Sequence, residues 1–314
     1  MNIVRLAVLA LTGLLALPSA RAVLISEKFI ADPTLSGWQL FGETNLFQWN
    51  STNQNMEVTW DSAQTNSYFY HSLGATFTKA DGFCIQFDLN LTDVNATGYF
   101  ELAVGLCNFA DATSPSFSRA NAASPNLFEF DYYPDGPDSW GPSMDATLID
   151  QNSLFYFVWD DTQPMLTDVV YRVVLIHQPG SSSISGTVLT NEQVFSTLPE
   201  IGAYGANDFQ LDTLSINNYT TLDDNYGDSL LAHGTVDNLS FASPLPIDKI
   251  TTIGAGQVQF GSDTNWLYTL EQSTDLKHWT AAAPASQGNG TNLLLQATNI
   301  TADAKFYRVR AELP

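Results

Sequence analysis

The stretch from Leu127 to Tyr133, LFEFDYY, constrains the fold most, because its apolar and polar side chains alternate with the period of a β-strand. One side of this strand would be apolar and aromatic, and the other would carry Glu129, Asp131 and Tyr133. Neighbouring carboxylates on an otherwise apolar strand repel each other and lose hydration, so a cation, a shared proton or open water must compensate them. The nature of that compensation is the main functional question.

Residues 1–22 are expected to be a signal peptide. Arg5 precedes an apolar core, and Ala20-Arg21-Ala22 offers an A-x-A cleavage site before Val23. The apolar run is too short to cross a membrane, and no later segment approaches the ~20 apolar residues that a spanning helix needs. The sequence therefore predicts an exported protein, secreted, periplasmic or on the cell surface, without membrane insertion.

The charge of the chain is strongly acidic and unevenly distributed. The formal net charge is −22, and 27 of the 33 acidic residues lie in 23–247 together with only four basic ones. Such a surface repels nucleic acid and suits neutral ligands, divalent cations or simple solubility. The drop in charge density predicts a domain at 23–243, a linker at 244–248 and a smaller unit at 249–314.

The rest of the chain is typical of an all-β protein. Short alternating runs rich in Thr, Val and aromatic residues are separated by Gly, Asn, Asp and Pro, and no stretch after residue 22 shows a helical period. This pattern predicts a β-sandwich.

Residues 83–91 and 99–107 are predicted to form a hairpin around the turn TDVNATG. In the register that puts Ile85 opposite Leu106, one side of the pair is entirely apolar, and a slip by one residue would destroy this partition. The same register places Cys84 opposite Cys107. These cysteines either form a disulfide or remain two buried thiols.

If 127–133 lies beside this hairpin, its polar side becomes one sheet surface bordered by aromatic rings. Carboxylates and amides accept sugar hydroxyl groups, and aromatic rings stack on pyranose faces, so the surface would suit a neutral glycan or extracellular polysaccharide. Simple solvation would also explain the pattern. The candidate ligand-binding residues are Gln86, Asp88, Asn90, Glu101, Tyr133 and Trp140.

The segments EFDYYPD, SEKFIADPTLSGWQLFG and LLAHGTVDNLSF resemble the concanavalin A-like lectin/glucanase superfamily over about Val23–Ser243. The resemblance implies a jelly-roll sandwich of two antiparallel sheets. In laminarinase-type glycoside hydrolases of this superfamily, Glu129 and Asp131 would match the first two catalytic positions. Tyr133 or Pro134 would stand at the third, where the acid/base Glu is required, which argues against that activity.

In the legume-type lectins of the same superfamily, a similar strand begins a metal site. The resemblance implies a Ca²⁺ site whose ligands would be Glu129, Asp131, Asp135, Asp138 and Asp145. Asp145 stands where those lectins have a His, and this favours an oxygen-seeking cation. The alternative is an acidic surface loop that binds nothing.

The C-terminal unit, with YTLEQSTDLKHW and FYRV, resembles fibronectin-like modules of exported bacterial proteins and would form a small β-sandwich. The sequence as a whole favours a non-catalytic, lectin-like carbohydrate-binding protein with possible support from calcium. The alternatives are a glycoside hydrolase or polysaccharide lyase, and a structural or adhesive surface protein.

Overall fold

The computed structural model describes most of the chain after residue 22, and its strands account for nearly all of the regular structure. Four antiparallel sheets are present among the described residues. The predicted all-β fold class is therefore confirmed. The described residues are 23–119, 123–135, 141–156, 163–181, 183–202, 208–222, 227–243, 245, 250–254, 256–264, 266–275, 278–298 and 306–312.

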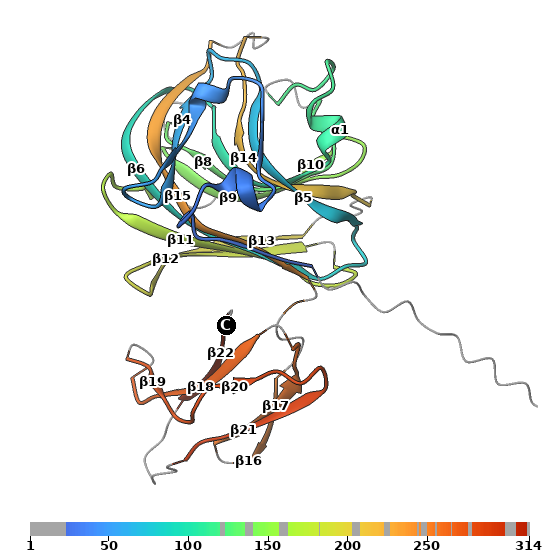
Figure 1. The fold of residues 1–314 in the computed structure, drawn as a ribbon, viewed down its shortest axis with the longest axis vertical. Coiled ribbons are helices and arrows are strands. Elements are labelled where there is room, and N and C mark those ends of the chain that lie inside the picture. Colours follow the sequence, from blue (N-terminus) through green and yellow to red (C-terminus); the bar gives the residue numbers. More distant parts are fainter. Residues whose placement is uncertain are drawn as a thin grey trace, which may run out of the picture.

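Two large sheets stack as the layers of a sandwich (Figure 1). Sheet A has the strand order β13-β12-β11-β6-β15-β4-β3, and β1 pairs with β15 beside this path. Its strands are β1 (Val23–Glu27), β3 (Phe47–Asn50), β4 (Asn55–Asp61), β6 (Phe83–Thr97), β11 (Val170–His177), β12 (Ser183–Thr190), β13 (Gln193–Gly202) and β15 (Ser229–Ser243).

Sheet B has the order β10-β9-β8-β7-β14-β5-β2. Its strands are β2 (Gln39–Phe41), β5 (Ser67–Phe77), β7 (Leu102–Cys107), β8 (Leu127–Tyr133), β9 (Ser143–Ile149), β10 (Phe155–Tyr156) and β14 (Leu211–Asn218). The helical turns of this unit are short: the 3-10 turns η1 (Pro33–Ser36) and η2 (Thr44–Leu46), and the helix α1 (Phe109–Ala112).

The core lies between sheets A and B, because each central strand turns its apolar side inward. Phe87 of β6 meets Phe130 of β8 edge to face, with ring centroids 5.9 Å apart, and Phe83 meets Phe128 in the same way at 5.0 Å. All four rings are fully buried. Burying one such side chain contributes about 1.5–3 kcal/mol, so these contacts fix which face of each strand points to the core.

The predicted hairpin of 83–91 with 99–107 is wrong. β6 continues to Thr97 because β15 provides a hydrogen-bonding partner along this whole extension, where Val94 lies opposite Ala232 and Ala96 opposite Leu230. β6 therefore belongs to sheet A, whereas β7 pairs with β8 and β14 in sheet B. The two apolar sides do face one core, but from opposite layers.

The disulfide prediction is wrong for the same reason. Cys84 lies on β6 in sheet A and Cys107 on β7 in sheet B, and both thiols are free. The Cys107 Sγ instead lies 3.7 Å from the hydroxyl oxygen of Ser215 on the neighbouring strand β14.

The C-terminal residues form two small sheets with a hydrophobic cluster of their own. One sheet has the order β16-β17-β21, and the other has β18 between β19, β20 and β22. Tyr268 and Leu270 are fully buried in this cluster, while Phe306 is 46% exposed. The strands are β16 (Thr251–Gly254), β17 (Gln257–Gly261), β18 (Leu267–Ser273), β19 (Thr280–Ala281), β20 (Ser286–Gln287), β21 (Asn292–Gln296) and β22 (Phe306–Glu312).

Candidate functional site

The side of sheet B that points away from the core is polar along its central strands, and we call it the polar face. The polar face includes Glu129, Asp131 and Tyr133 on β8, with Asp145 directly opposite Asp131 on β9. The sequence predicted this face to be open to solvent. It is instead buried: all seven residues of β8 and all seven of β9 are inaccessible or nearly so.

Part of this cover comes from a segment that lies over the polar face, residues 108–119 and 123–126, which we call the strap. It begins with α1, whose N-cap Asn108 accepts a hydrogen bond from the Asp111 amide. Side chains of the sheet and of the strap itself hold it at several points. These contacts are Phe109 N to Asp212 Oδ1 (3.0 Å), Tyr68 Oη to Ala112 O (2.9 Å), Asn126 Nδ2 to Asp111 Oδ2 (2.7 Å) and the ring of Phe117 on that of Tyr219 (5.8 Å).

Arg119 of the strap enters the acidic part of the polar face. Its Nη2 donates a 2.6 Å hydrogen bond to Asp131 Oδ2, and its Nε lies 3.1 Å from Glu101 Oε1 and 3.7 Å from Glu129 Oε2. The guanidinium carbon is 5.8 Å from the ring centre of Tyr219. The side chains of Arg119 and of the three acids are at most 4% exposed, so a buried guanidinium is part of the compensation that the sequence left open.

Protons are the second part of that compensation. Burial, with the neighbouring Asp131 charge, raises the pKa of Glu129 to about 8, although Arg119 and a hydrogen bond from Tyr219 act in the opposite direction. Asn217 Nδ2 also donates to Glu129 Oε1 at 2.6 Å. Burial raises the pKa of Glu101 to about 7 against the opposing effect of Arg119, and burial likewise raises the pKa of Asp131. Burial therefore favours bound protons in this cluster, while Arg119 favours its charged form.

The predicted calcium ligands fit a metal ion poorly where the structure describes them. Arg119 contacts Glu129 and Asp131, Asp145 Oδ2 accepts a 3.0 Å hydrogen bond from Ser143, and Asp135 Oδ2 accepts one of 3.2 Å from Gly98 N. Among the described residues, no group of three or more His, Cys, Asp or Glu side chains is arranged to hold a metal. Asp138 lies outside the described residues.

The predicted ligand-binding residues do not form one surface. Gln86, Asp88 and Asn90 are on β6 in sheet A, whereas the other described members belong to the polar face of sheet B. Asp88 is held by Arg172, whose Nε and Nη2 donate at 2.8 and 3.0 Å, and by Asn238 Nδ2 at 2.8 Å. The prediction of a shared face fails because it depended on the hairpin.

The remaining predicted members are too deeply buried, or lie outside the description. Glu101 is 5% and Tyr133 6% exposed, so neither offers its side chain to a sugar. Burial raises the pKa of the Tyr133 phenol well above its usual value. Trp140 lies outside the described residues.

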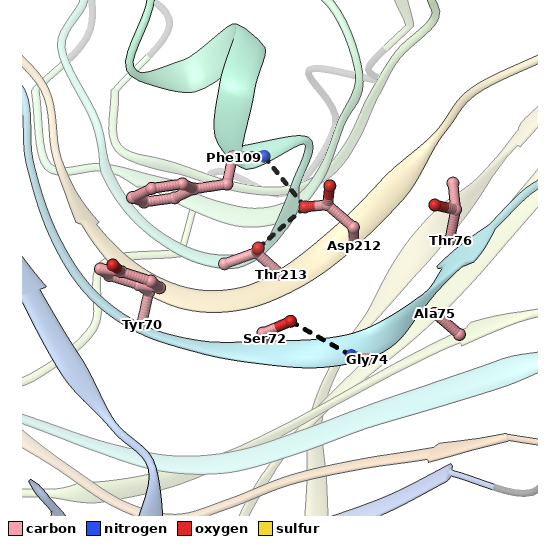
Figure 2. Close-up of a pocket in the computed structure, with 8 residues that line it drawn as sticks. All are labelled: Tyr70, Ser72, Gly74, Ala75, Thr76, Phe109, Asp212 and Thr213. Carbon is pink, nitrogen blue, oxygen red and sulfur yellow. Dashed lines mark hydrogen bonds between the residues drawn. The ribbon is translucent and has the colours of Figure 1, made fainter.

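An accessible hollow of about 430 Å³ lies beside the strap, over β5 and β14 (Figure 2). The rings of Tyr70 and Phe109 stack there with centroids 4.2 Å apart and planes inclined by 27°. Asp212 Oδ1 accepts hydrogen bonds from Phe109 N and Thr213 Oγ1 (Figure 2). The lining residues are Tyr70, Ser72, Gly74, Ala75, Thr76, Phe109, Asp212 and Thr213.

Sequence reasoning missed this hollow, although part of the signal was present. Tyr68, Tyr70 and Ser72 alternate along β5 on the side that pairs with the polar residues of β14. The contribution of Phe109 to the lining of the hollow could not be predicted, because nothing in the local sequence shows that the strap folds back over β5.

The comparisons with known proteins add a likeness in fold only. Neither protein-family models nor curated proteins match this chain. Solved structures that resemble it include peanut lectin (TM-score 0.42, 10% identity, 70% of this chain and 99% of that one) and a Lotus tetragonolobus seed lectin (0.44, 12%, 72% and 99%). Another is an alginate lyase in complex with alginate trisaccharide (0.34, 10%, 70% and 97%).

Such low scores and identities carry no argument about activity. The strand pairing itself defines an antiparallel two-layer β-sandwich. Within the described residues, no helix is long and apolar enough to cross a membrane.

Proposed function

We propose that this is an exported, non-catalytic carbohydrate-binding protein that holds a neutral glycan in the hollow beside the strap. The observation that carries the proposal is the Tyr70–Phe109 stack, which lies next to hydroxyl groups and a carboxylate in one accessible depression. Aromatic faces attract the C–H face of a pyranose, and a few convergent polar groups then fix its orientation.

The polar groups of the hollow fit sugar hydroxyls. Ser72 and Thr76 are exposed on β5, and Asp212 is partly exposed on β14. Asp212 Oδ1 is already engaged with the strap, so a ligand hydroxyl would donate to Oδ2. A carboxylate that accepts from a hydroxyl forms a charge-assisted hydrogen bond, which is stronger than a neutral one.

The charge of the hollow favours a neutral ligand over an acidic one. None of the described residues that line it is Lys, Arg or His, and Asp212 would repel the carboxylate of a uronic acid. This argues against an acidic polysaccharide as the ligand.

The enzyme alternatives have less support from the polar face. A retaining glycoside hydrolase needs two accessible carboxyl groups about 5 Å apart that flank the bond to be cleaved. Glu129 and Asp131 are fully buried, Arg119 contacts both, and Tyr133 stands at the third position of the motif. A structural or adhesive role without a small ligand is the alternative, and it predicts that no oligosaccharide binds.

The test is a calorimetric titration of the mature protein with neutral gluco-, manno- and galacto-oligosaccharides and with oligoalginate. We expect a neutral oligosaccharide to bind, and Phe109→Ala to weaken it about tenfold, the equivalent of ~1.4 kcal/mol. Tyr99→Ala is the matched control, since this aromatic residue is 41% exposed and lies outside the hollow. Absence of neutral-sugar binding, or a Phe109→Ala variant that binds as the wild type does, contradicts the proposal.

A further inference from the structure

Arg119 is an unusual residue for this domain. Residues 23–247 contain only four basic side chains among 27 acidic ones. Lys28 and Arg172 are not buried, whereas Arg119 is 7% exposed and lies among three buried acids. Burying a cation costs free energy unless the cation is paired. The ion pairs with these acids therefore offset the desolvation of the Arg119 guanidinium.

The three acids that contact Arg119, and the neighbouring Asp145, come from more than one strand. Glu129 and Asp131 project from β8, Glu101 directly precedes β7, and Asp145 lies opposite Asp131 on β9. Without a positive charge these carboxyl groups would repel each other in a site that excludes water. The guanidinium is the cation that the described residues place at this point.

Arg119 also belongs to the strap, whose first turn carries Phe109. The contacts of Phe109 N with Asp212 and of Ala112 O with Tyr68 fix the beginning of the strap. Its end is fixed by Asn126, whose Oδ1 accepts a hydrogen bond from Gln210 N. Arg119 is a fixed point between them. The ion pairs with β8 therefore both neutralise negative charge in the cluster and hold the strap in place.

We propose that Arg119 is a built-in counter-ion that supplies the positive charge which a divalent cation would otherwise have to bring to these acids, and so locks the strap onto sheet B without a metal. This inference does not depend on glycan binding. If the proposed function holds, Arg119 also positions Phe109, whose ring lines the hollow, and glycan binding does not require a metal.

Thermal melts of the full mature chain in EDTA and in millimolar Ca²⁺ test the proposal. The wild-type melting temperature should be the same in both. Arg119→Ala should lose about 10 °C in EDTA, because it leaves buried carboxylates without their partner. Ca²⁺ should restore part of that loss, because an ion that binds only the native state raises its stability by mass action.

Two further variants keep the test decisive. Arg119→Ala/Asp131→Asn should melt higher in EDTA than Arg119→Ala and respond less to Ca²⁺, because one uncompensated charge is gone. Arg172→Met removes the ion pair with Asp88, in which the side chains are 44% and 10% exposed. It should lower the melting temperature less than Arg119→Ala does, because one acid rather than three loses its partner and Asn238 still donates to it, and it should show no Ca²⁺ response.

Each melting result either supports or overturns the proposal. A wild-type protein that melts lower in EDTA than in Ca²⁺ overturns the proposal, and so does an Arg119→Ala variant that is as stable as the wild type or insensitive to Ca²⁺. If Arg119→Ala fails to fold in EDTA, folding of the double variant supports the proposal, and its failure overturns it. These melts contain no sugar, so a failed glycan titration leaves their outcome unaffected.

Discussion

Asp131 and Asp145 lie directly opposite each other on β8 and β9, and both are fully buried. Like charges in directly opposed positions destabilise a sheet, and burial adds to this cost. Protonation of the acidic cluster relieves it. The titratable and charged groups around the cluster are Glu101, Glu129, Asp131, Tyr133, Asp145, Tyr68, Tyr219, Arg119 and, near Glu101, Asp228.

The pH dependence of stability follows from the raised pKa of Glu129. This pKa is about 8 in the folded protein against an ordinary value of 4.5, so the native state keeps a proton that the unfolded chain has already released. The contribution is complete below about 4.5 and is lost as the pH rises through about 8. The free energy of unfolding, measured in urea, should therefore fall between pH 5 and pH 8.

The variant Glu129→Gln should flatten this decline, because it removes the titrating group and keeps an acceptor for Asn217. Glu43→Gln is the matched control, since Glu43 is exposed and its side chain caps no helical turn. A Glu129→Gln variant with the same slope as the wild type would show that the buried cluster does not bind protons in the native state.

Gly105 on β7 is predicted to tolerate no side chain without a loss of stability. A Cβ atom at this position would lie 2.2 Å from the carbonyl oxygen of Phe128 and 2.6 Å from the Cα of Glu129, so the β7–β8 backbone would have to shift. Gly105→Ala should destabilise the sandwich by about 1–3 kcal/mol in urea unfolding. Gly261→Ala, where no atom lies within 4 Å of the added Cβ, should be close to neutral. Equal effects at the two sites would contradict the close packing of β7 against β8.

The thiol prediction follows from the placement of the cysteines in different sheets. Denatured, unreduced protein should show two thiols that react with a chromogenic disulfide reagent, and a reductant should leave the melting temperature unchanged. In the native protein Cys107 should react much more slowly than Cys84, because it is fully buried. Detection of fewer than two thiols in the unreduced denatured chain would show that a disulfide has formed.

The alternation of β6 shows what the sequence could establish and what it could not. Ile85, Phe87 and Leu89 were predicted to share an apolar side, and all three are fully buried. Their pairing partner was predicted wrongly, because a local pattern defines the inward side of a strand but not the layer to which it belongs. The polar run after Leu91 has the composition of a turn, yet pairing with β15, more than 130 residues away, keeps it extended.

The candidate site illustrates the same limit. The acids on β8 were correctly identified as needing compensation. The adjacency of β7 and β8, which the sequence analysis had only assumed, is present. Arg119 was not identified, although it is one of only four basic residues in 23–247 and lies a few positions before the acidic strand, which is a usable signal. Ion pairing across a sheet depends on tertiary contacts that no spacing rule encodes.

The two units of the chain should fold independently, with a boundary within the predicted linker 244–248. Phe241 and Leu239 of β15 close the hydrophobic cluster of sheets A and B, while Val258 begins a separate cluster in the second unit. A domain that buries its own core keeps its stability when a neighbour is removed. A protein ending at Ser243 should therefore melt within a few degrees of the main transition of the mature chain, as measured by calorimetry. A large loss of stability would show that the second unit completes the sandwich, and the boundary would then be wrong.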